Sequence, residues 1–305
     1  MSMLDQRDFV AAMAREGVHV AEVDRLRMDG VLCRFSTSDR DRYRRQRNGW
    51  AVIFTDGPRP VVTFGDWSQG ISQTVVVGGE IDLSAAERER QRIALEQART
   101  ARQAELRARH ASAAREAERL WSTASAACEF HPYLMRKTID AHGLRERGGF
   151  LLVPLRNDRG DLMNVQKIRA DGQKRFLRGG RVAGLYASIG VVGDHLLLCE
   201  GWATAKSLHR ATGLPVAVAF SSGNLLAVAE VLRRKYPASR ITVCADNDFK
   251  PDGSNPGVKA ATAAAMAVGG HLAIPPSNGD FNDFYAAGPG NTAMIEVFTS
   301  ESSTR

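Results

Sequence analysis

The sequence predicts an α/β protein that ends in a parallel, Rossmann-like sheet with flanking helices, preceded by smaller β-rich regions. From about residue 193, four short apolar runs alternate with three helical segments, which is typical of a parallel doubly wound sheet. Residues 84–120 contain neither Gly nor Pro, which indicates one long helix. On either side of that helix, short β-rich runs are separated by Gly and Asp-Gly turns.

Residues 1–83 are predicted to form an α+β domain with a possible role in binding single-stranded DNA. An amphipathic helix from Asp5 to Arg15 is followed by the strand-like runs GVLCRFS, GWAVIFTDG, PVVTFGDW and QTVVVGGE. Between the first two runs lies an arginine-rich segment that ends at an aromatic residue. Charge and stacking could hold a single strand there, although a charged surface loop fits the pattern equally well. The candidate binding residues are Arg44, Arg45, Arg47 and Trp50.

The middle of the chain divides into a linker and a basic region. Residues 84–120 carry many opposite charges at i,i+4 spacing, which favours a solvated spacer helix; a helix that grips nucleic acid or self-associates is the alternative. Residues 121–190 form a predicted basic subdomain that is helical to about residue 145 and then a β-meander of two or three antiparallel strands.

Acidic residues follow three strands of the predicted C-terminal domain, residues 191–298. Glu200 ends the first strand, Asp246 and Asp248 end the third, and Asp280 and Asp283 follow the fourth. Because functional groups of an open α/β sheet gather at the carboxyl ends of its strands, these carboxylates should converge. Carboxylates that converge without partners repel one another, and their oxygens suit a hard cation, so the sequence predicts Mg²⁺ or Mn²⁺. Helix capping is the alternative role for any single aspartate.

The tail, residues 299–305, is predicted to be disordered.

Composition narrows the function classes. The 305 residues hold 41 Lys+Arg against 34 Asp+Glu, a net charge of +7 that hints at a polyanionic partner. No two of the four cysteines form a C-x-x-C pair, so no zinc is expected. The N-terminus lacks the apolar core of a signal peptide, and no apolar stretch is long enough to span a membrane. We therefore expect a cytoplasmic protein without a membrane partner.

The spacing of the acids resembles a known family. Glu200-Gly201 after an apolar strand, followed by Asp246-x-Asp248 after another strand, is similar to the Toprim domain of bacterial-type primases, topoisomerases and some nucleases. The segments CEGWATAKSLHRATGLPVAVAFSSGNL, ADND, NPGVKAA and GDFNDF resemble, more narrowly, the primases encoded by phages and conjugative plasmids. The resemblance covers about residues 130–290. The sequence departs from some related primases in two ways: it has no Cys/His spacing for zinc and no P-loop motif. We therefore expect neither a zinc-binding domain nor a fused helicase.

The resemblance implies roles for individual residues. Glu200 would act as general acid or base, while Asp246, Asp248 and Asp280 would hold the metal. The basic residues that would contact the template or the incoming nucleoside triphosphate are Arg156, Lys167, Lys174 and Arg175.

The activity implied is that of a DNA primase, a DNA-directed RNA polymerase that makes short RNA primers on single-stranded DNA during replication or transfer of a plasmid, phage or other mobile element. A replicative helicase is a further candidate partner. Two alternatives stay open at this point: a Toprim metal-dependent nuclease, and a non-catalytic accessory protein that binds single-stranded DNA.

Overall fold

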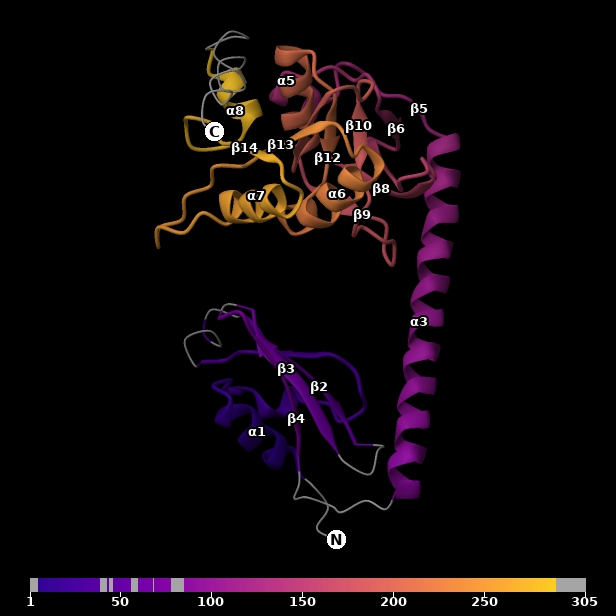
Figure 1. The fold of residues 1–305 in the computed structure, drawn as a ribbon, viewed down its shortest axis with the longest axis vertical. Helices are drawn as coiled ribbons and strands as arrows, with labels where there is room; N and C mark the ends of the chain where they lie inside the picture. The colour runs from indigo at the N-terminus through magenta and orange to yellow at the C-terminus, as the bar shows by residue number, and fades with distance from the viewer. Residues whose placement is uncertain are drawn as a thin grey trace. The chain divides into compact units, whose positions relative to one another are not determined.

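The computed structural model describes residues 5–38, 43, 46–55, 60–67, 69–77 and 85–288 (Figure 1). The chain forms two compact units, Met1–Arg102 and Gln103–Arg305, and each is treated by itself. None of the helices within the described ranges is both long enough and apolar enough to cross a membrane.

The first unit is an antiparallel sheet with one helix packed on it. Helix α1 buries Phe9 and Met13 against strand residues such as Phe35, Ile53 and Phe64. Asp5 caps this helix: it forms a reciprocal capping box with Asp8. The elements are α1 (Gln6–Arg15), the short 3₁₀ helix η1 (Val23–Arg25), and strands β1 (Cys33–Phe35), β2 (Gly49–Phe54), β3 (Val61–Asp66) and β4 (Ile71–Val76), paired in the order β1-β2-β3-β4.

The long polar segment is a single helix, α3 (Ala85–Ser122). Pairs such as Arg109–Glu105 and Arg119–Glu116 are spaced one turn apart on its surface. The division between the two units falls inside this helix, at residues 102 and 103, whereas the sequence treats 84–120 as a separate linker. The predicted domain boundaries therefore stay a prediction.

The basic region of the second unit is a five-stranded antiparallel sheet, larger than the predicted meander. The expected helical stretch 121–145 is wrong for most of its length, because only six residues of it after α3 are helical. His131 caps that short helix, Pro132 begins it, and Thr138 in a left-handed conformation ends it. The elements, with sheet order β5-β6-β7-β8-β9, are β5 (Ser125–Ala126), α4 (Pro132–Lys137), β6 (Arg145–Arg147), β7 (Phe150–Arg156), β8 (Leu162–Ile168) and β9 (Lys174–Phe176).

The C-terminal part is the predicted parallel sheet with flanking helices. Four parallel strands alternate with three helices, as the sequence indicates, and an antiparallel edge strand and a short final helix are added. Apolar cores cover both faces of the sheet. The sheet order is β10-β12-β11-β13-β14, and the elements are β10 (Ala187–Ile189), β11 (His195–Cys199), α5 (Trp202–Thr212), β12 (Val216–Val218), α6 (Ser222–Lys235), β13 (Arg240–Cys244), α7 (Pro256–Ala267), β14 (His271–Ala273) and α8 (Phe281–Ala286).

Candidate active site

Three of the predicted acids meet in one cleft. Glu200 follows β11, Asp246 follows β13 and Asp280 follows β14, so parallel strands deliver all three to the same edge of the sheet. They line a cleft of about 280 Å³ together with Lys174 from β9. The fourth acid, Asp248, does not line the cleft, but its charge acts on both Glu200 and Asp246.

Asn247, between the two aspartates of the D-x-D motif, fixes the position of that loop. Its backbone exchanges two hydrogen bonds of 2.9 Å with Gly279, the residue before Asp280. Its side-chain amide donates to the carbonyl of Pro275 at 3.1 Å and accepts from Asn255 at 2.8 Å. The loops after β13 and β14 are thus tied together, which holds Asp246 beside Asp280.

Asp280 lines the cleft and also caps a helix. Its Oδ1 accepts hydrogen bonds from the backbone N–H groups of Asn282 at 2.7 Å and Asp283 at 2.9 Å, so it caps α8. Capping, which the sequence leaves as the alternative role, therefore does not keep this carboxylate out of the cleft. Helix α8 is in turn held to α4, because Lys137 Nζ lies 3.0 Å from Asp283 Oδ1.

Glu200 lies against the start of α6. Burial raises the pKa of its carboxyl above the usual value, and the charges of Asp248 and Asp280 add to the rise, while Lys174 and the backbone N–H of Ser222 oppose it. The link from β12 to α6 runs through Phe220, whose φ of 70° is unusual for a residue with a side chain. Phe220 also lines the cleft. A carboxyl whose pKa is raised in this way is suited to take up and release a proton.

Among the acids of the cleft, Asp246 has the largest rise in pKa. Burial, and then the charges of Glu200, Asp280 and Asp248, raise its pKa to about 7. Its Oδ1 is buried and finds no hydrogen-bond partner within the described residues. The neighbouring acids offer carboxylate oxygens as metal ligands, so the residues present fit a hard divalent cation, Mg²⁺ or Mn²⁺. Across the described part of the chain, no three acidic, His or Cys side chains are already gathered as a ligand set.

Gly257 keeps the first turn of α7 close to Asp246. A Cβ at this position would lie 2.3 Å from the backbone oxygen of Asp246, which is too close for any side chain. Because the obstructing atom belongs to the backbone, a larger residue would displace Asp246 itself.

The four predicted basic residues are not brought together. Residues of β8 and β9 alternate between two faces of their sheet, and Gln166, Lys174 and Phe176 line the cleft. Lys167 and Arg175 pair with each other across β8 and β9, so they share the opposite face. The charge of Lys167 helps to lower the pKa of Glu116 on α3. The guanidinium of Arg156 donates a hydrogen bond to the carbonyl of Gly160 at 2.9 Å and lies over the ring of Trp121. Only Lys174 of this set lines the cleft, and the roles of the other three stay predictions.

Tyr133 and Lys137 are among the residues of the cleft wall that sequence reasoning missed. They lie four apart on α4, a spacing that places them on one face of the helix. Tyr133 is 2% exposed, and its hydroxyl has no partner within the described residues. Burial by itself would lower the pKa of Lys137, but its hydrogen bond to Asp283 and the charge of Asp280 raise it. The i,i+4 spacing in HPYLMRK indicates that the two side chains share a helix face, but it does not place that face beside the acids.

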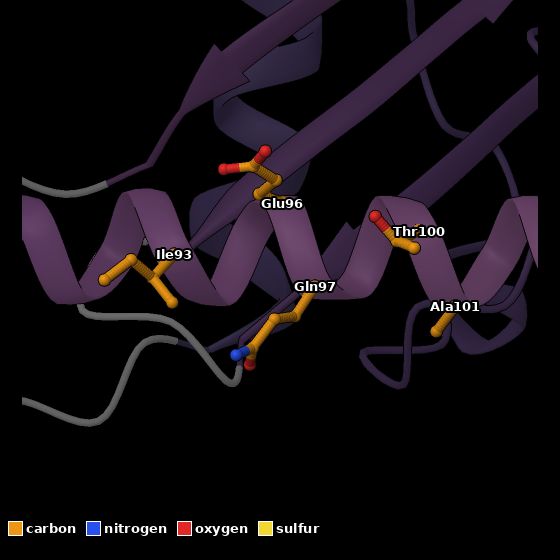
Figure 2. A pocket seen from close by; sticks show the side chains of 5 residues that line it. All are labelled: Ile93, Glu96, Gln97, Thr100 and Ala101. Atoms are coloured by element: carbon orange, nitrogen blue, oxygen red, sulfur yellow. The ribbon is translucent and has the colours of Figure 1, made fainter.

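The N-terminal candidates lie in the first unit. Arg47 is exposed, and the ring of Trp50 stacks on Trp67. Arg44 and Arg45 lie outside the described residues. A further hollow on α3 is lined by five residues from successive turns of that one helix (Figure 2). Its only charged side chain is Glu96, so it offers no comparable chemistry. The five are Ile93, Glu96, Gln97, Thr100 and Ala101.

Comparison with known proteins agrees with this geometry. The Toprim domain family matches residues 195–289, which carry the three cleft acids at the ends of β11, β13 and β14.

Residues 195–289 form a Toprim domain.

The chain is also similar to two curated proteins named DNA primase TraC from Escherichia coli. One is 35% identical over 155 residues, which is 47% of this chain and 11% of that protein. The other is 34% identical over 155 residues, again 47% of this chain, and 15% of that protein. The chain thus spans a small fraction of the length of these relatives. The predicted resemblance to plasmid primases with a Toprim domain is confirmed.

Solved structures similar to the chain include primase domains. The DnaG primase catalytic domain bound to ssDNA is 12% identical with a TM-score of 0.47, covering 65% of this chain and 80% of that one. The primase fragment of the bacteriophage T7 primase-helicase protein is 14% identical with a TM-score of 0.43, covering 53% of this chain and 71% of that one.

Proposed function

We propose that the chain is a DNA primase-like nucleotidyltransferase that makes short RNA primers on single-stranded DNA, with nucleoside triphosphates as substrates and a replicative helicase as a candidate partner. The observation that supports this most is the cleft in which Glu200, Asp246 and Asp280 of the Toprim domain face Lys174 of the adjoining sheet. Similarity to the TraC primases supports the same activity.

Each side of the cleft has its own task in this proposal. Asp246, Asp248 and Asp280 would hold Mg²⁺ or Mn²⁺, which neutralises phosphate charge when bound. Lys174 and Lys137 would contact the triphosphate, because ammonium groups pair with phosphate oxygens. The hydroxyl of the primer end attacks the α-phosphorus, the bond between α- and β-phosphates breaks, and pyrophosphate leaves. The carboxylate of Glu200 accepts the proton of the attacking hydroxyl.

A primer-synthesis assay tests the proposal. The protein is incubated with single-stranded DNA, labelled ribonucleoside triphosphates and Mg²⁺ or Mn²⁺, and products are resolved by length. We expect short, template-dependent products, their loss in Glu200→Gln, and full synthesis in Glu230→Gln, whose carboxylate is exposed on α6. Shortening of labelled strands without triphosphates would instead support the nuclease. Binding without either reaction would support the accessory protein.

A further inference from the structure

The first unit carries a stacked aromatic cluster on the sheet face opposite α1. Strand pairing sets Arg34, Trp50 and Gly65 in one row across β1, β2 and β3. Directly opposed residues of antiparallel strands share a face, and neighbours such as Ala51 and Phe64 point into the core with α1. The row therefore lies on the face that α1 leaves uncovered.

Two aromatic rings stack on this face, and that of Trp67 is accessible. The rings of Trp50 and Trp67 stack with centroids 5.9 Å apart and planes inclined by 28°. The guanidinium of Arg34 lies 4.6 Å from the centre of the Trp67 ring. Trp67 nevertheless keeps 53% of its surface exposed. A Cβ on Gly65 would lie 2.8 Å from the indole nitrogen of Trp50, so the missing side chain is what lets this ring lie across β3.

Two arginines of the described residues lie at the stacked rings. Arg34 also donates from Nη2 to the carbonyl of Arg47 at 3.0 Å, which brings the exposed Arg47 to the same edge of the sheet. The sequence from 34 to 47 holds six arginines against two aspartates. An exposed ring beside Arg34 and Arg47 has the chemistry to bind a chain of bases and phosphates.

We propose that this surface, defined by Arg34, Arg47, Trp50 and Trp67, binds single-stranded DNA. A base stacks on the accessible surface of Trp67, and the two arginines contact the flanking phosphates. Single strands are favoured over duplexes because only unpaired bases expose a flat face to a ring. This site is separate from the cleft of the Toprim domain, so binding here does not depend on synthesis there.

The test is the affinity of the full chain for a fluorescein-labelled oligo(dT) of about 16 nucleotides, measured by anisotropy without triphosphates or metal. We expect Trp67→Ala to weaken binding about fivefold or more, and Trp67→Phe to retain most of the affinity, because it keeps a ring. Arg34→Ala should weaken binding and reduce the slope of log affinity against log salt by about 0.7. The control is Met266→Ala, which removes a side chain that is 78% exposed on α7.

Unchanged affinity in both Trp67→Ala and Arg34→Ala would overturn the proposal. So would an equal loss for single-stranded and duplex DNA in Trp67→Ala, because stacking predicts a selective loss. Melting temperatures of both variants report on folding, and two substitutions at exposed positions guard against a loss caused by unfolding. Failure of the primase proposal looks different: the wild type would make no primers while its binding stayed sensitive to Trp67.

Discussion

The hydroxyl of Tyr133 is a candidate contact for a substrate bound in the cleft. This group is buried and unpartnered among the described residues, so the fold loses little when it is removed. If it donates to the bound nucleotide, Tyr133→Phe should raise KM for nucleoside triphosphates about three- to tenfold and leave kcat and the melting temperature close to wild type. Steady-state primer synthesis and thermal melting measure the two effects. A lower melting temperature with unchanged KM would show a purely structural role.

A second residue-scale prediction concerns the crowded charge at Asp246. Removing this carboxylate ends the cost of burying its charge and relieves repulsion from Glu200 and Asp280, so Asp246→Asn should raise stability in EDTA above pH 7 by about 1 kcal/mol or more. The variant should also lose primer synthesis. Mg²⁺ should raise the melting temperature of the wild type and have little effect on the variant.

The matched control for Asp246→Asn is Asp194→Asn. Asp194 is exposed at the opposite end of β11, away from the carboxyl edge of the sheet. This substitution should change neither stability nor the response to Mg²⁺. An equal gain in both variants would mean that net charge, and not the local cluster, decides the effect.

Sequence reasoning predicted the acids of the site better than its cations. The carboxyl-end rule needs only the strand pattern, and it correctly placed Glu200, Asp246 and Asp280 at one edge. Choosing between Lys174 and Arg175 requires knowing which face of β9 meets the Toprim sheet, and that depends on tertiary packing. Tyr133 belongs to a segment far from the acids in sequence, so no local pattern connects it with them.

At the scale of elements, the ion pair between Lys206 of α5 and Asp140 joins the two parts of the second unit. Lys206 Nζ lies 2.5 Å from Asp140 Oδ1, and its side chain is 7% exposed. Asp140→Asn leaves a buried ammonium without its carboxylate and should cost about 2 kcal/mol. Lys206→Met keeps the volume without the charge and should cost less. Chemical denaturation measures both, and a larger loss in Lys206→Met would contradict this account.

The same pair gives stability a pH dependence. Burial alone would raise the pKa of Asp140, but its hydrogen bond and charge interaction with Lys206 lower it below the ordinary value of 3.8. Because the folded-state pKa is the lower one, the stabilisation is complete above the unfolded pKa and is lost as pH falls through the folded one. The difference in stability between wild type and Asp140→Asn, measured by denaturation, should therefore shrink as the pH falls below the ordinary value of 3.8.

Gly257 makes a prediction about how α7 positions the acid loop. Gly257→Ala forces a Cβ against the backbone oxygen of Asp246 and should cost about 1–3 kcal/mol with loss of primer synthesis. Gly223→Ala in α6 is the control, since a Cβ there meets nothing within 4 Å. Because Ala favours helix, this control should be neutral or stabilising. Equal effects at the two glycines would refute the close contact.

The elements that sequence reasoning missed are the short ones. Strand β10 and helix α8 have three and six residues, too few for a period to show. The sequence pattern extends the predicted helix through residues 121–145, whereas Pro132 and the left-handed Thr138 limit helix α4 to six residues. The long α3 and the alternating C-terminal elements were predictable because their periodicity persists over many residues.

At the scale of the whole molecule, each unit has its own apolar core. Phe64 belongs to the core of the first unit, and Leu197 and Val243 belong to those of the second. Calorimetry should therefore resolve two transitions. Phe64→Leu should lower one of them, while Asp140→Asn should lower the other. A single transition that shifts in both variants would show that the units fold together.

The alternation along β9 has a consequence for recognising related chains. One step along this strand carries a cation from the cleft, at Lys174, to the opposite face, at Arg175. In an alignment of relatives that share the activity, position 174 should keep a positive residue, and position 175 should vary more freely. Overall basicity, with its excess of +7, should drift between species without loss of function. A single aligned column is thus a sharper marker of the proposed activity than the isoelectric point.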